Sequence, residues 1–153
     1  MLKSWNILTF INVIFTLATK TFILEKVYNI LLADDDEDDL SILSAVLEND
    51  PQFNVIGQLN NGRKIIDYLH SGPRPDLIIT DLYMPIMTGT EVVDHLLKTG
   101  ALRDMRIVVF STTVDKSEEE KFAMLENITF MAKPNSLQSY SELSEKLLDY
   151  MLI

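Results

Sequence analysis

The chain has 153 residues, enough for one ordinary domain with a hydrophobic core, and its formal net charge is −10. Residues 1–26 hold three lysines and one glutamate, a net charge of +2, which leaves −12 for residues 27–153. An acidic body argues against nucleic-acid binding, because that function depends on basic patches that contact phosphates. The absence of cysteine excludes disulfides, thiolate metal sites and cysteine catalysis, and it fits a reducing cytoplasm.

The first 26 residues differ from the rest of the chain. Sixteen uncharged and largely apolar residues, 4–19, follow Lys3. This stretch is shorter than the about 20 apolar residues of a membrane span. Three interpretations stay open: a signal peptide, a membrane-associating helix, and an apolar tail or over-extended start. We favour the tail, so the domain covers residues 27–153, and membrane association through residues 1–26 is the alternative to a cytoplasmic location.

From residue 27 on, short apolar runs alternate with longer amphipathic stretches, a pattern typical of strands that alternate with helices. The apolar runs predict five strands, at residues 27–33, 53–59, 77–80, 105–111 and 128–132. The amphipathic stretches predict five helices, at residues 38–49, 63–70, 90–98, 115–127 and 136–151. This alternation predicts an α/β domain with a parallel sheet and helices on both of its faces.

Carboxylates stand at the ends of two of these strands. Asp34 and Asp35 follow the first strand, and Asp81 follows the third. The carboxyl ends of parallel strands meet at the edge of the sheet where ligands bind. Two carboxylates 4 Å apart repel one another by roughly 4 kcal/mol at an effective dielectric constant of about 20. Such a cluster therefore indicates a site for a divalent cation, a proton or a phosphoryl group.

Two further strand ends and one loop complete a recognisable pattern. Ser111 ends the fourth strand, Lys133-Pro134 follows the fifth, and residues 81–89 have the pattern D-x-x-M-P-x-x-x-G. With the acid pair, these features make residues 27–151 similar to the receiver domain of bacterial response regulators, of the stand-alone CheY-like type. The resemblance implies a flavodoxin-like, doubly wound sheet with the strand order 2-1-3-4-5.

The same resemblance implies a role for each acid. Asp81 would be the phosphoacceptor, whose carboxylate forms an acyl phosphate. Asp34, Asp35 and Asp81, with the backbone carbonyl of Tyr83, would hold Mg²⁺, which prefers a few oxygen ligands and phosphate oxygens to an all-protein cage. The neighbouring acids Asp36, Asp38 and Asp39 have a plainer interpretation, because acidic residues favour a helix N-terminus.

Three more residues have roles by resemblance. Lys133 would contact the Asp81 carboxylate and then the phosphoryl oxygens, with a cis peptide bond before Pro134. The hydroxyl of Ser111 would donate to a phosphoryl oxygen once Asp81 is modified. Phe130 stands at the aromatic switch position, although an ordinary core phenylalanine is an equally good interpretation.

The sequence thus predicts a stand-alone response regulator, a signalling protein rather than an enzyme that acts on other substrates. Its partners would be a sensor histidine kinase or histidine phosphotransfer protein and a downstream protein target, without nucleic acid. One alternative is an interaction module with the same fold that works without phosphorylation, although such a module need not retain Asp34, Asp35, Asp81 and Lys133. A haloacid dehalogenase-type phosphatase is disfavoured, because Tyr83 stands where that class needs a second aspartate.

Overall fold

The computed structural model describes residues 7–8, 11–12, 14, 26–113 and 116–152. Five parallel strands form one sheet in the order β2-β1-β3-β4-β5, which confirms the predicted fold class and strand order. The strands are β1 (Tyr28–Ala33), β2 (Phe53–Leu59), β3 (Leu77–Asp81), β4 (Arg106–Ser111) and β5 (Ile128–Ala132). The helices are α2 (Glu37–Glu48), α3 (Gly62–Ser71), α4 (Gly89–Thr99), α5 (Lys116–Phe122), α6 (Leu137–Ser141) and α7 (Leu143–Leu152).

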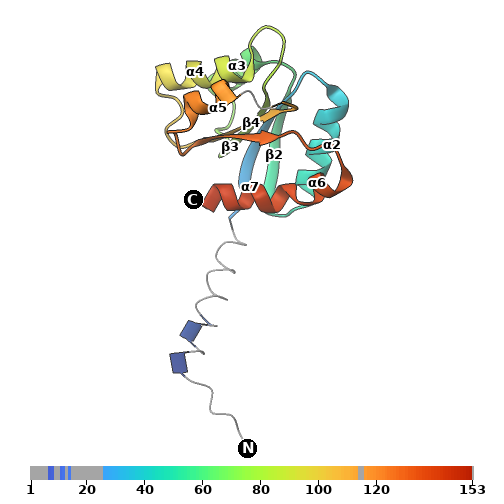
Figure 1. The fold of residues 1–153 in the computed structure, drawn as a ribbon, viewed down its shortest axis with the longest axis vertical. Helices are drawn as coiled ribbons and strands as arrows, with labels where there is room; N and C mark the ends of the chain where they lie inside the picture. The colour runs from blue at the N-terminus through green and yellow to red at the C-terminus, as the bar shows by residue number, and fades with distance from the viewer. Residues whose placement is uncertain (1–6, 9–10, 13, 15–25, 114–115, 153) are drawn as a thin grey trace, which may run out of the picture.

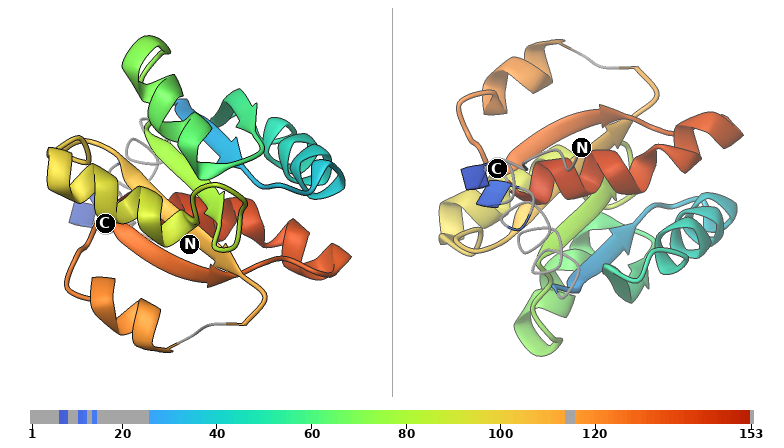
Figure 2. Two further views of the ribbon diagram at one scale, coloured as in Figure 1. Left: turned by 90° about the horizontal axis from the view of Figure 1, so that it is seen from above. Right: turned by 90° about the horizontal axis from the view of Figure 1, so that it is seen from below.

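The helices form a layer on each face of the sheet, with α3, α4 and α5 on one side and α2, α6 and α7 on the other (Figure 1). Figure 2 shows α4 in front of the strands in one view and α7 in front of them in the other. Two apolar clusters result, one around Ile78 and Val92 and one around Leu32 and Leu147. Because the central strands β1, β3 and β4 are covered on both faces, they consist mainly of apolar residues.

Side-chain caps fix where four of the described helices begin, including α6, which Ser136 caps. The carboxylate of Asp36 accepts hydrogen bonds from the backbone N–H groups of Asp38 and Asp39 at the start of α2. Asn61 caps α3 in the same way, and Thr88 forms a capping box at the start of α4. Such caps satisfy N–H groups that have no partner within the helix. The capping prediction is therefore confirmed for Asp36.

The last predicted helix, residues 136–151, is divided by a turn at Glu142 into α6 and α7. In the first part, the Oγ atoms of Ser139 and Ser141 donate to the backbone carbonyls of Ser136 and Gln138. Serine side chains that bond to nearby backbone groups compete with the helix ladder. This competition explains why one amphipathic stretch forms two helices, and the described part of the chain beyond residue 26 has six helices rather than five.

Helix α5 is also shorter than predicted. The prediction covered residues 115–127, of which 115 lies outside the described residues, and α5 ends at Phe122. The chain that follows is held by β4 and by the segment before it: the carbonyl of Glu126 accepts from Arg106, and the side chain of Asn127 donates to the carbonyl of Leu102. These long-range hydrogen bonds replace those that further helical turns would have made. They join residues far apart in the sequence, so the local sequence pattern does not predict them.

The N-terminal segment falls almost wholly outside the residues that the structure describes. Among the described residues, no helix combines the length and the apolar character needed to cross a membrane. The interpretation of residues 1–26 stays a prediction.

Gly89 is the point where α4 starts against the end of β3. A Cβ atom added to Gly89 would lie 2.5 Å from the backbone carbonyl oxygen of Asp81, closer than real Cβ contacts allow. The Gly89 N–H also donates to the carbonyl of Leu82 at 2.9 Å. Glycine in the D-x-x-M-P-x-x-x-G pattern therefore lets the helix approach the strand end that carries Asp81.

We expect Gly89→Ala to lower the free energy of unfolding by about 1 to 3 kcal/mol, because the added methyl group must displace backbone rather than a flexible side chain. Urea unfolding measures the change. Lys98→Ala on the exposed side of the same helix is the matched control and should stay within about 0.5 kcal/mol of the parent. Equal stability of the two variants would contradict the close approach.

Candidate functional site

Side chains from three strand ends meet at the carboxyl edge of the sheet. Asp34 follows β1, Asp81 ends β3, and Lys133 follows β5. The Lys133 ammonium lies 2.6 Å from Oδ2 of Asp34 and 3.5 Å from Oδ1 of Asp81. The three side chains are largely buried, with 15% of Lys133, 7% of Asp34 and 12% of Asp81 exposed. The structure thus brings together three of the four residues that were expected to share a site.

Backbone N–H groups orient both carboxylates. Oδ1 of Asp34 accepts from the N–H of Asp36 at 3.0 Å, and Oδ2 of Asp81 accepts from the N–H of Tyr83 at 2.9 Å. In each aspartate, the other oxygen is the one that faces Lys133. The turns that follow the strands therefore determine which oxygen of each carboxylate points into the site.

The pKa values follow from burial and from this charge arrangement. Burial raises the pKa of the Asp81 carboxyl, and the negative charge of Asp34 adds to the effect, whereas Lys133 and the Tyr83 N–H act against it. Burial of Lys133 favours its neutral amine, but hydrogen bonds to carboxylates and the charges of Asp34 and Asp81 outweigh this and raise its pKa. Lys133 is therefore a permanent cation beside an acid whose ionised form the fold disfavours.

A third carboxylate in the site was missed. Oδ2 of Asp39, in the first turn of α2, lies 2.7 Å from the Lys133 ammonium. The sequence favoured helix capping for Asp39, but Asp36 is the residue that caps α2. The usable signal was that α2 starts at Glu37, three residues after Asp34, so its first turn lies at the edge of the sheet where Lys133 follows β5.

Asp35 is the expected site residue that the cluster does not include. Its side chain is exposed, and no described residue bonds to its carboxylate. Among the described residues, no group of three or more acidic, histidine or cysteine side chains is arranged to hold a metal. The donor chemistry nonetheless suits Mg²⁺, since Asp34, Asp81 and the Tyr83 carbonyl offer only hard oxygen atoms at one sheet edge. A magnesium site there stays a prediction.

Ser111 ends β4, between the strands that carry Asp81 and Lys133. Its side chain is buried, its hydroxyl donates to the carbonyl oxygen of Thr113, and the Thr113 N–H donates back to the hydroxyl at 3.2 Å. No bond joins it to Asp81 among the described contacts. Because a hydroxyl has one proton, Ser111 can donate to a group on Asp81 only if it gives up its hydrogen bond to the Thr113 carbonyl.

Phe130 lies on β5, half-buried against the core cluster that contains Phe122. Its ring stacks on that of Phe122 from α5, with the centroids 6.1 Å apart and an angle of 14° between the planes. The arrangement is that of a packed aromatic residue at an edge strand, and it leaves both interpretations of Phe130 open.

The expected cis bond between Lys133 and Pro134 is wrong for this structure, because every described peptide bond is trans. For a bond before proline, trans is the more stable isomer by about 0.5 to 1 kcal/mol. The Lys133 N–H pairs with the carbonyl of Ser111 at 3.0 Å, which extends the β4–β5 ladder to the residue that carries the ammonium.

The loop between β3 and α4 holds an apolar residue in an unfavourable conformation. Ile86 has φ of +70°, and 81% of its surface is exposed. This left-handed region costs an L-residue about 1 to 2 kcal/mol, and a β-branched side chain is among the least suited to it. Tyr83, in the same loop, is also exposed.

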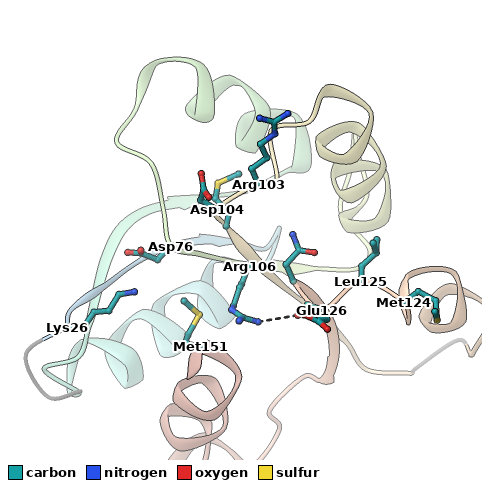
Figure 3. Close-up of a pocket in the computed structure, with 11 residues that line it drawn as sticks. Lys26, Asp76, Arg103, Asp104, Arg106, Met124, Leu125, Glu126 and Met151 are labelled. Carbon is teal, nitrogen blue, oxygen red and sulfur yellow. Dashed lines mark hydrogen bonds between the residues drawn. The ribbon is translucent and has the colours of Figure 1, made fainter. Parts of the chain in front are cut away.

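A pocket of about 520 Å³ lies at the opposite, amino end of the strands (Figure 3). Its lining includes Lys26 before β1, Asp76 before β3, Arg106 at the start of β4 and Asn127 before β5. The guanidinium of Arg106 donates to the carbonyl of Glu126 at 3.2 Å. Ligands of open α/β sheets bind at the carboxyl ends of the strands, so the cluster around Lys133 is the better candidate site.

Comparison with known proteins agrees with this fold. The model of the response regulator receiver domain matches residues 30–145. The chain therefore belongs to the response regulator receiver domain family. It is 28% identical over 125 residues to the two-component response regulator ORR5 of Oryza sativa subsp. japonica, covering 78% of this chain and 88% of that protein.

Other relatives are longer proteins. The chain is 33% identical over 125 residues to a protein-glutamate methylesterase/protein-glutamine glutaminase of Rhizobium johnstonii, which covers 77% of this chain and 34% of that protein. The chain spans about a third of the length of the methylesterases it matches. The similarity therefore concerns their receiver part, and it places this chain in a signalling family.

Two solved structures have a similar fold. The response regulator domain of Thermotoga maritima CheB superposes with a TM-score of 0.67 at 24% identity and covers 84% of this chain and 98% of that one. A chain from the complex of the CheA3 P1 domain with CheY6 of R. sphaeroides gives a TM-score of 0.66 at 26% identity, with 84% and 99% covered.

Asp81→Asn should raise the free energy of unfolding at pH 7.5 by about 1 kcal/mol, because it removes a charge that burial and Asp34 disfavour. A raised folded-state pKa means that the parent loses stability as the pH rises from the unfolded value of 3.8 to the folded one. The advantage of the variant should therefore disappear near pH 4. Urea unfolding at both pH values tests this; a gain that is independent of pH would contradict the assignment.

We expect Ile86→Asn to raise the free energy of unfolding by about 1 kcal/mol, since asparagine tolerates the left-handed region. Ile86→Val is the matched control, because it retains the β-branch, and it should give no gain. Thermal unfolding of the parent and the two variants measures the change. Equal stability of Ile86→Asn and Ile86→Val would show that backbone strain at this position does not limit stability.

Proposed function

We propose that this chain is a stand-alone response regulator that accepts a phosphoryl group on Asp81. The observation that carries the proposal is the Lys133 ammonium between the carboxylates of Asp34 and Asp81, at 2.6 and 3.5 Å. Family membership supports it, and so does the orientation of the Asp81 carboxylate. An ion pair kept only for stability would not need this arrangement, because buried charges at a strand end are costly.

In the proposed reaction, a carboxylate oxygen of Asp81 attacks phosphorus as the bond to the donor breaks. The donor is the phosphohistidine of a sensor histidine kinase or of a histidine phosphotransfer protein, so a P–N bond is exchanged for a P–O bond. The Tyr83 N–H holds Oδ2 of Asp81 in place, which leaves Oδ1, on the side of Lys133, to react. Lys133 then stabilises the charge on the phosphoryl oxygens.

Mg²⁺, held by Asp34, Asp81 and the Tyr83 carbonyl with help from the exposed Asp35, would supply further charge stabilisation. Positioning and electrostatics are the whole contribution of the protein to such a transfer. Loss of the phosphoryl group to water would use the same residues.

The modified state would be transmitted through Ser111 and Phe130. The Ser111 hydroxyl would exchange its bond to Thr113 for one to a phosphoryl oxygen, which pulls the loop after β4 inward. That shift changes the room available to Phe130 and Phe122, which stack across β5 and α5. A downstream protein would read the altered surface, in the cytoplasm where the kinase forms its phosphohistidine.

Incubation with acetyl phosphate and Mg²⁺, followed by intact-mass measurement, tests the proposal. The parent and the matched control Asp67→Asn, an exposed acid on α3, should each gain one phosphoryl group, and Asp81→Asn should gain none. A chelator should abolish the labelling. Labelling of Asp81→Asn equal to that of the parent would show that the acceptor is misassigned. Failure of the parent to label with either acetyl phosphate or a phosphohistidine donor would favour the phosphorylation-independent interaction module.

A further inference from the structure

The Lys133 ammonium is bound more closely by Asp39 than by Asp81. Its distance to Oδ2 of Asp39 is 2.7 Å, against 3.5 Å to Oδ1 of Asp81. A charge-assisted N–H···O bond is about 2.7 to 2.9 Å long, so the contact with Asp39 is a full hydrogen bond and the contact with Asp81 is not. Of the three protons of the ammonium, two are therefore directed at Asp34 and Asp39.

Asp39 is held firmly enough to compete for the lysine. Its own N–H donates to the capping carboxylate of Asp36 at 3.2 Å, and the next residue, Leu40, is buried in the core. The first turn of α2 is thus fixed at both the backbone and the side-chain level. The backbone of Asp39 therefore has a defined position, from which its carboxylate reaches Lys133.

The two strong partners of Lys133 differ in how easily they can release it. Asp34 is 7% exposed and receives a backbone N–H on its other oxygen, whereas Asp39 is 36% exposed. A buried carboxylate that loses its partner has no water to replace it, but a carboxylate at the surface is readily hydrated. Any new anion that draws the ammonium toward Asp81 will therefore take it from Asp39.

We propose that Asp39 is a positioning residue that holds Lys133 in a resting place away from Asp81 and releases it when the phosphoryl group arrives. The proposal rests on the proposed function, in which Asp81 is the acceptor. In the resting state, Asp39 restrains the cation that the reaction needs. In the modified state, the phosphoryl oxygens replace Asp39 as the hydrogen-bond partner of Lys133.

Two consequences follow for Asp39→Asn, which removes the charge and retains the shape. Labelling of Asp81 by acetyl phosphate should be about fivefold faster, because Lys133 is freed to move toward Asp81 and the site repels an anionic donor less. The phosphorylated form should also live about fivefold longer, since nothing draws the ammonium back from the phosphoryl oxygens.

Asp38→Asn is the matched control, because Asp38 has the same charge in the same helical turn, is exposed, and is not paired with Lys133. Asp39→Glu retains the charge and should restore rates near those of the parent. The ¹⁵N resonance of the Lys133 ammonium gives a readout without phosphorylation: it should shift in Asp39→Asn and not in Asp38→Asn. Urea unfolding establishes that each variant is folded.

The inference fails if the parent labels on Asp81 but Asp39→Asn and Asp38→Asn have equal rates and equal Lys133 resonances. Slower labelling of Asp39→Asn would also overturn it, because Asp39 would then assist the acceptor instead of restraining the lysine. The proposed function fails differently, through a parent that does not label or an Asp81→Asn variant that does. The two failures are therefore distinguishable in one set of measurements.

Discussion

The charge of the candidate site depends on one ammonium group and the three carboxylates around it. Lys133 lies within 4 Å of Asp34, Asp39 and Asp81, so the cluster keeps an excess negative charge that the fold must tolerate. Burial increases the cost, because water cannot screen these charges from one another. A site of this kind is stabilised by additional positive charge, and such charge would favour the phosphoryl transfer that we propose for Asp81.

The sheet makes this arrangement possible by bringing distant residues to one edge. β1 and β3 are neighbours, and β4 separates β3 from β5, so only a long side chain at the end of β5 can reach back to Asp81. Lysine is the residue with a flexible stem and a compact charge, which suits this span. The extension of the β4–β5 ladder to Lys133 fixes where that stem begins.

The sequence was sufficient for the strands and for the meeting of Asp34 and Asp81, because apolar runs and strand-end carboxylates follow from burial and from parallel geometry. The strand order and the approach of Lys133 to Asp81 were expected only from the resemblance to receiver domains. The sequence was not sufficient for the break at Glu142, which depends on serine hydroxyls that bond backward to the backbone. The contact between Asp39 and Lys133 was also missed, since it joins residues 94 positions apart and a run of acids at a helix start has a simpler local explanation.

The main chain at Asp81 is clamped from both sides. The N–H of the next residue, Leu82, bonds to Phe110 of β4, and the start of α4 presses against the Asp81 carbonyl through Gly89. The backbone that carries the proposed acceptor is consequently held on two sides by neighbouring elements. If Asp81 is the acceptor, a rearrangement on phosphorylation would therefore involve the side chains and loops around it more than its own backbone.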